Sequence, residues 1–187
     1  MFAPVLKTVF RKDRVRSQAE TLYAALAGRS RAPEFYAIAG APDTPEGRFD
    51  LLSLHMFLII DRLRREAPET DRLVRLVQEV FFERLDSALR EMGVGDLSVG
   101  RKIRGLAEAF YGRYAAYETG VRDESGALKA ALARNVYGSD DAERALLLAD
   151  YVRAARSHLS AVPLDALDAE VDALAEISRR LISREAP

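Results

Sequence analysis

The stretch REMGVGDLSVGRKI, residues 90–103, decides how this chain folds. Residues 70–92 before it carry apolar side chains at steps of three and four, and residues 103–117 after it do the same. That spacing is typical of a helix with one buried face. Glycines at positions 93 and 95 interrupt the pattern between the two segments. The stretch therefore predicts two long helices joined by a short turn, packed as antiparallel neighbours.

Helical spacing extends over the whole chain, and strand-like alternation is absent. Thr44 can cap a helix whose first residue, Pro45, loses no needed hydrogen-bond donor. Residues 51–60 are nearly all apolar and predict a buried core helix, because a membrane span needs about 20 such residues. We expect an all-α fold, a single compact bundle of seven or eight helices forming one domain over residues 1–187. The expected helices cover residues 14–28, 33–39, 45–66, 70–92, 97–120, 125–137, 141–160 and 163–183.

The composition excludes several classes of function. The chain has no cysteine, so it has no disulfide, catalytic thiolate or iron–sulfur cluster. Its 28 basic and 29 acidic residues nearly cancel, so the surface is not built to coat DNA. Arginine far outnumbers lysine, which in an alanine-rich chain is typical of a GC-rich genome.

Catalytic patterns are weak, and we expect no enzyme activity, catalytic residue, metal or cofactor. Neither histidine lies in a nucleophile-elbow or metal-binding motif. His55 interrupts the apolar run and is better interpreted as a hydrogen-bonded core histidine than as a ligand. A haem or small-molecule carrier would need His55 as that ligand.

The N-terminal segment, residues 1–16, is basic and amphipathic. Its apolar residues follow helical spacing, and Lys7, Arg11 and Arg14 lie off that stripe. Three interpretations fit this pattern: a helix docked on the bundle, an anchor at a membrane surface, or a mitochondrial transit peptide.

The glycine turn does not match a phosphate loop, because such loops follow a strand. Gly93 and Gly95 suit positions of positive φ, and Asp96 or Ser98 can cap the next helix. A plain helix-to-helix turn explains these residues together with Gly100. It does not explain three cations close to the helix N-terminus, where the dipole disfavours positive charge. Their presence favours an acidic or phosphate-bearing partner; the three are Arg101, Lys102 and Arg104.

Four sequence blocks resemble the ubiquinol–cytochrome c chaperone family, in the expected order. They are DTPEGRFD at 43–50 with Leu54-His55 after it, REMGVGDLSVGRK at 90–102, AFYGR at 109–113 and LARNV at 132–136. The similarity covers about residues 21–159. The basic N-terminal segment and the C-terminal helix at 163–183 lie outside it.

The resemblance implies a non-enzymatic assembly factor for respiratory complex III that binds newly made cytochrome b. Mitochondrial relatives work at the mitochondrial ribosome with a small partner protein. The arginine content, and the absence of a serine-rich leader, favour a bacterial member. Such a member would act in the cytoplasm, peripherally on the inner face of the inner membrane; a eukaryotic one would act in the mitochondrial matrix. The alternative is a membrane-surface scaffold that acts through residues 1–16.

A holdase for a membrane protein needs an apolar groove with a charged rim. We expect this groove between the helix ending at Met92 and the helix beginning near Leu97. Phe81 and Phe82 point about 100° apart on one helix, so one of them can line it. The expected apolar contacts are Phe82, Met92, Tyr111 and Tyr114, and the expected charged contacts are Arg101, Lys102 and Arg104. A buried ionic lock is expected from Asp43, Arg48, Asp86 and Arg90.

Overall fold

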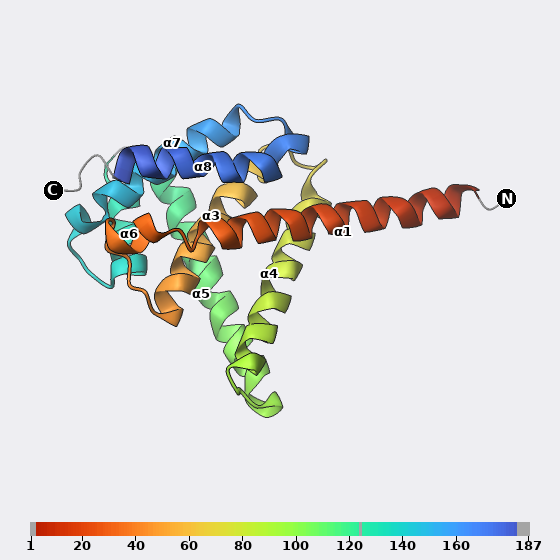
Figure 1. The fold of residues 1–187 in the computed structure, drawn as a ribbon, viewed down its shortest axis with the longest axis horizontal. Helices are drawn as coiled ribbons and strands as arrows, with labels where there is room; N and C mark the ends of the chain where they lie inside the picture. Colours follow the sequence, from red (N-terminus) through yellow and green to blue (C-terminus); the bar gives the residue numbers. More distant parts are fainter. Residues whose placement is uncertain (1–2, 124, 183–187) are drawn as a thin grey trace.

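Eight α-helices and two short 3-10 helices make up the residues that the computed structural model describes, 3–123 and 125–182, and no strand occurs among them. The expected all-helical bundle is confirmed (Figure 1). Side chains are described from Arg14 to Leu181, except at residue 124. The helices are α1 (Ala3–Arg29), α2 (Pro33–Ala37), α3 (Pro45–Arg64), α4 (Asp71–Glu91), α5 (Asp96–Arg122), α6 (Ala127–Tyr137), η1 (Ala142–Ala145), α7 (Leu146–Ser160), η2 (Leu164–Ala166) and α8 (Leu167–Ile182).

Helix α3 forms the centre of the core. Every residue from Asp50 to Leu63 is buried, because α1, α4, α5, α6 and α7 all pack against this helix. The prediction of a buried core helix at residues 51–60 is therefore confirmed. The described helices include none that is both long and apolar enough to cross a membrane.

Helices α4 and α5 diverge from a shared turn and form a V-shaped arm (Figure 1). Gly93 has φ of +83°, a left-handed conformation that glycine adopts without strain. Its amide donates to the Arg90 carbonyl at 2.9 Å and the Val94 amide to the Leu89 carbonyl at 3.0 Å, which closes the end of α4.

Two expectations about this turn are wrong. Gly95 has φ of −67°, and it is itself the N-cap of α5, with no side-chain cap from Asp96 or Ser98. Asp96 instead pairs with Arg90 across the turn. The turn is tied by backbone bonds and an ion pair, so a capping side chain is not needed there.

Some helix boundaries also differ from prediction. Gly120 does not end α5 but lies inside it, where a Cβ atom would stand 2.7 Å from the Cα of Leu128. The glycine therefore permits close packing of α5 against α6. The segment expected as one helix at 141–160 begins with the 3-10 turn η1, and the last expected helix likewise begins with η2. Residue 183, its expected end, lies outside the described residues.

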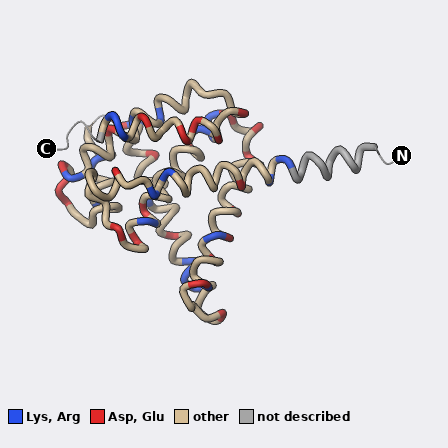
Figure 2. The backbone as a smooth tube through the Cα atoms, viewed as in Figure 1, with Lys and Arg blue, Asp and Glu red and all other residues tan. Residues whose placement is uncertain are grey.

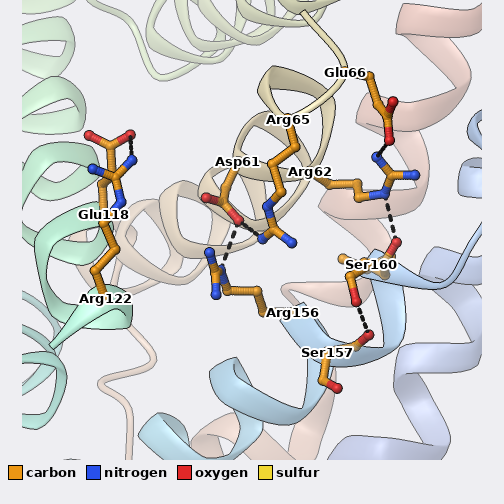
Figure 3. A network of polar contacts seen from close by, with 10 residues as sticks. Asp61, Arg62, Arg65, Glu66, Glu118, Arg122, Arg156, Ser157 and Ser160 are labelled. Carbon is orange, nitrogen blue, oxygen red and sulfur yellow. Dashed lines mark hydrogen bonds and ion pairs between the residues drawn. The ribbon is translucent and has the colours of Figure 1, made fainter. Parts of the chain in front are cut away.

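A polar network joins the end of α3 to α7 (Figure 3). Asp61 accepts from Arg156 at 2.9 Å and also pairs with Arg65. Arg62, 7% exposed, donates to the backbone carbonyls of Leu159 at 2.8 Å and Val162 at 3.0 Å. An arginine is thus buried at the C-terminus of α7, where helix carbonyls need donors and the dipole favours a cation.

Candidate functional site

A groove of about 1170 Å³ runs beside the arm, and we call it the arm groove. Its walls come from α1, the start of α3, the second half of α4 and the middle of α5. The larger apolar side chains that line it are Tyr23, Phe49, Leu52, Leu85, Leu89, Met92 and Leu106. The expected location between α4 and α5 was thus incomplete, since α1 and α3 supply the other walls.

An ion pair lies in the lining of the groove. Arg113 on α5 places Nη2 2.7 Å from Oδ1 of Asp50 on α3, and its guanidinium lies 5.5 Å from the centre of the Phe49 ring. Burial raises the pKa of the Asp50 carboxyl to about 6, although Arg113 acts in the opposite direction. The groove therefore contains a buried, titratable carboxyl next to an aromatic ring.

The wall at residues 42–47 depends on one glycine. The Thr44 hydroxyl accepts from the Gly47 amide at 3.1 Å, which confirms the predicted cap. A Cβ atom on Gly47 would lie 2.0 Å from the carbonyl oxygen of Pro42. Only glycine lets the chain fold back this tightly onto the first turn of α3, and the sequence pattern did not indicate this contact.

The predicted contact residues do not form one surface. Met92, 65% exposed, and Lys102 line the arm groove. Arg101, Arg104 and Tyr111 are exposed but do not line it. They recur with the fully exposed Leu97 at helical spacing, so they share a different face of α5.

The two remaining aromatic residues belong to the packing of the bundle. Phe82 is half-buried, with its ring centre 5.9 Å from that of Phe110. Tyr114 is 6% exposed, packs against Phe57, and is covered by Arg64 at 4.7 Å. The expectation of a surface contact at Tyr114 is wrong, because α5 turns this side chain toward α3.

The expected buried lock is also wrong. Arg48 binds Asp43 at 2.7 Å with both side chains 58% exposed. Arg90 binds Asp86 at 2.6 Å, again with both side chains accessible. These are two separate surface pairs, each between residues close in sequence, and such pairs contribute only about 0–1 kcal/mol.

The model of one protein family, described as "Ubiquinol-cytochrome C chaperone", matches residues 38–171, well over half of the chain. The chain belongs to this family. The resemblance expected from the sequence blocks is therefore confirmed.

Individual relatives of this chaperone-family chain are complex III assembly factors by name. The ubiquinol-cytochrome-c reductase complex assembly factor 1 of Xenopus laevis is 26% identical over 77% of this chain and 73% of its own length. The mouse and human proteins of that name are each 23% identical, and the chain spans about half of their length, 52% and 49%.

A solved structure is more similar to this family member. The crystal structure of the Cbp3 homolog from Brucella abortus has 34% sequence identity and a TM-score of 0.75, and the match covers 88% of this chain and 93% of that one. The match includes most of the helices that form the arm groove.

His55, next to one of the blocks that resemble the chaperone family, is a core residue as predicted. Its ring is fully buried, with Nδ1 2.8 Å from the Leu51 carbonyl and Nε2 2.9 Å from the Tyr151 hydroxyl. A carbonyl only accepts, so Nδ1 carries the proton and Nε2 accepts from Tyr151. Both ring nitrogens are used, and the structure contradicts a role for His55 as a haem ligand.

The buried His55 predicts a specific pH dependence of stability in this chaperone-family protein. Burial lowers its pKa from 6.5 to about 4. Between these values the unfolded chain binds a proton that the folded chain does not, so stability is complete above pH 6.5 and is lost as the pH falls toward 4. Relative to His55→Gln, the native protein should lose on the order of 3 kcal/mol of unfolding free energy across that range. Urea titrations at several pH values measure this difference.

The pKa of Asp50 is raised by folding, so its effect on stability as the pH falls has the opposite sign. Asp50 is present in both the native protein and the His55→Gln variant, so its contribution cancels when their unfolding free energies are compared. If the unfolding free energies of the two proteins differ by the same amount at every pH from 7 to 4, His55 is not held neutral by its surroundings.

Proposed function

We propose that this protein is an assembly chaperone of the ubiquinol–cytochrome c reductase complex and holds an apolar segment of newly made cytochrome b in the arm groove. The observation that carries the proposal is the groove itself. At about 1170 Å³ it exceeds the range of about 300–1000 Å³ usual for small-molecule sites. The names of the relatives support the same complex.

The proposed chemistry is binding without catalysis. An unassembled membrane helix exposes apolar surface to water, and burying that surface releases about 25 cal/mol for each Å². Leucine and methionine side chains along α4 can adapt to different segments, since methionine in particular is flexible. Binding without a covalent bond is reversible, so a segment can leave when the complex receives it.

We propose that the protein acts in a bacterial cytoplasm, in peripheral contact with the inner face of the inner membrane. The similarity to the Brucella abortus structure supports a bacterial member. Contact with the ribosome and with a small partner protein belongs to the same proposal. Ribosome contact predicts binding that weakens steeply with salt, because phosphate contacts release counterions.

Complementation of a deletion strain tests the groove. Leu89 and Met92 line it from α4, and we expect Leu89→Glu/Met92→Glu to reduce mature complex III by at least tenfold, because two carboxylates would stand in the apolar contact surface. A photoreactive residue at Leu106 should cross-link to tagged cytochrome b in the unaltered protein. Complex III is measured by the ubiquinol–cytochrome c reductase activity of membranes.

The matched control is Leu97→Glu, since Leu97 is fully exposed, lies at the arm tip and does not line the groove. Normal complex III in the Leu89/Met92 variant would refute the groove as the client site. Removal of residues 1–16 tests the alternative function, a membrane-surface scaffold that acts through this segment. That alternative requires the deletion by itself to abolish function.

A further inference from the structure

Two arginines that line the arm groove have no acidic partner among the described residues. Arg31 lies just beyond the end of α1, and Arg84 lies on α4, which packs against α1. Neither forms an ion pair within the part of the chain that the structure describes, where Arg31 donates only to the Ala27 carbonyl, at 2.8 Å. Both side chains belong to exposed residues at the groove wall. Figure 2 shows Lys and Arg positions together with Asp and Glu positions along the backbone of the described helices.

Most acidic residues of the same walls are already paired. The pairs are Asp43 with Arg48, Asp50 with Arg113 and Glu20 with Arg16. Glu46 lies in the first turn of α3, where the helix dipole stabilises a carboxylate. Glu91 closes α4 seven residues after Arg84, about 10 Å along the axis. Among the described residues of the lining, the unpaired cations Arg31, Arg84 and Lys102 therefore outnumber the unpaired acids Glu46 and Glu91 by one.

Tyr23 lies in the groove lining together with Arg31 and Arg84. Its ring lines the groove, with its centre 6.5 Å from that of Phe81. Burial raises the pKa of its hydroxyl, while Arg31 and Arg84 both act to lower it, so both guanidinium groups lie within electrostatic range of that oxygen. A neutral phenol is a hydrogen-bond donor. All three side chains belong to the lining of the arm groove, and each can donate a hydrogen bond there.

We infer that the arm groove recognises a client segment that carries a carboxylate, held by Arg31 and Arg84 beside the Tyr23 hydroxyl. This inference rests on the proposed function, because it names the chemistry of the segment that the groove receives. Hydrogen bonds from a guanidinium to a carboxylate are about twice as strong as neutral ones. Leu85 and Leu89, which follow Arg84 on α4, add apolar surface to the same wall. An apolar segment with one acidic residue would be selected over one without it.

Three synthetic peptides test this selection. They are identical fluorescein-labelled alanine–leucine helices that differ only in a central glutamate, glutamine or arginine. Fluorescence anisotropy with the full chain should give a dissociation constant at least tenfold lower for the glutamate peptide than for the glutamine peptide, because the charge-assisted bonds add that discrimination. The arginine peptide should bind most weakly.

Reversal of one wall charge sharpens the test. Arg84→Glu should invert the order, so that the arginine peptide binds better than the glutamate peptide. The matched control is Arg75→Glu on the same helix. Arg75 is exposed, precedes Arg84 by two and a half turns, and therefore lies on the opposite face of α4. This control should leave the order of the three peptides unchanged.

Each outcome is decisive. Equal binding of the glutamate and glutamine peptides would overturn carboxylate recognition and leave the groove as a purely apolar site. An Arg84→Glu protein that still prefers the glutamate peptide would overturn it as well. If none of the peptides binds, the inference falls, and the cross-link from Leu106 to cytochrome b decides separately whether the proposed function falls with it.

Discussion

Replacing Arg62 by alanine should lower the free energy of unfolding by about 3–5 kcal/mol. The side chain is buried between α3 and α7 and donates to the carbonyls of Leu159 and Val162. It also binds Glu66 at 2.9 Å. Alanine would remove these donors and leave a cavity where the arginine stem packs. Urea denaturation followed by circular dichroism measures the change.

The comparison for Arg62 is Arg122→Ala, drawn in the same view (Figure 3). Arg122 pairs with Glu118 at 3.1 Å, but its side chain is 68% exposed. Its loss should cost less than about 1 kcal/mol, because solvent screens exposed pairs. Equal effects of the two substitutions would show that the contacts of Arg62 with α7 do not stabilise the fold.

Replacing Gly47 by alanine should destabilise the protein by about 3 kcal/mol or more, at the upper end of the cost of overpacking. The new methyl group would overlap the carbonyl oxygen of Pro42, which is backbone and has no rotamer to adopt. Relief requires residues 42–44 to move away from the first turn of α3. Two of those three residues, Asp43 and Thr44, line the arm groove, so binding of the glutamate peptide should weaken together with stability.

Gly112→Ala is the control for this substitution. Gly112 is exposed within α5, and nothing lies within 4 Å of a Cβ atom built there. Alanine should stabilise the helix by about 0.5–1 kcal/mol, because glycine loses more conformational entropy on folding. Thermal unfolding distinguishes the two, with the melting temperature lowered for Gly47→Ala and raised for Gly112→Ala. Tolerance of alanine at both positions would contradict the close approach of Pro42 to α3.

Local patterns accounted for most of the helices and for part of the site. The three- and four-residue spacing placed α3, α4 and α5 within a few residues of their observed bounds, because that signal is contained in each segment. Thr44 and Gly93 act at helix ends as expected, since capping involves only neighbouring residues. His55 was identified as a core residue because it interrupts an apolar run.

The errors about the site concern where a side chain points and which residue it pairs with. Tyr114 is buried because α5 crosses α3 at that point, and nothing in its own helix indicates this. Asp43 and Asp86 each pair with an arginine four or five residues away, so no lock joins them. Arg31 and Tyr23 were absent from the expected site, since α1 reaches the groove only through tertiary packing.

By itself the sequence determined the all-helical class, the turn at the arm tip, the core position of α3 and the family to which the chain belongs. Only the tertiary structure decided which helix faces enclose the groove, that Arg62 is buried at the end of α7, and that Gly47 lies against Pro42. The physical reason is that helix periodicity and capping arise from contacts within a few residues. The groove and the close approaches arise instead from the angles at which distant helices cross, and no local pattern encodes those angles.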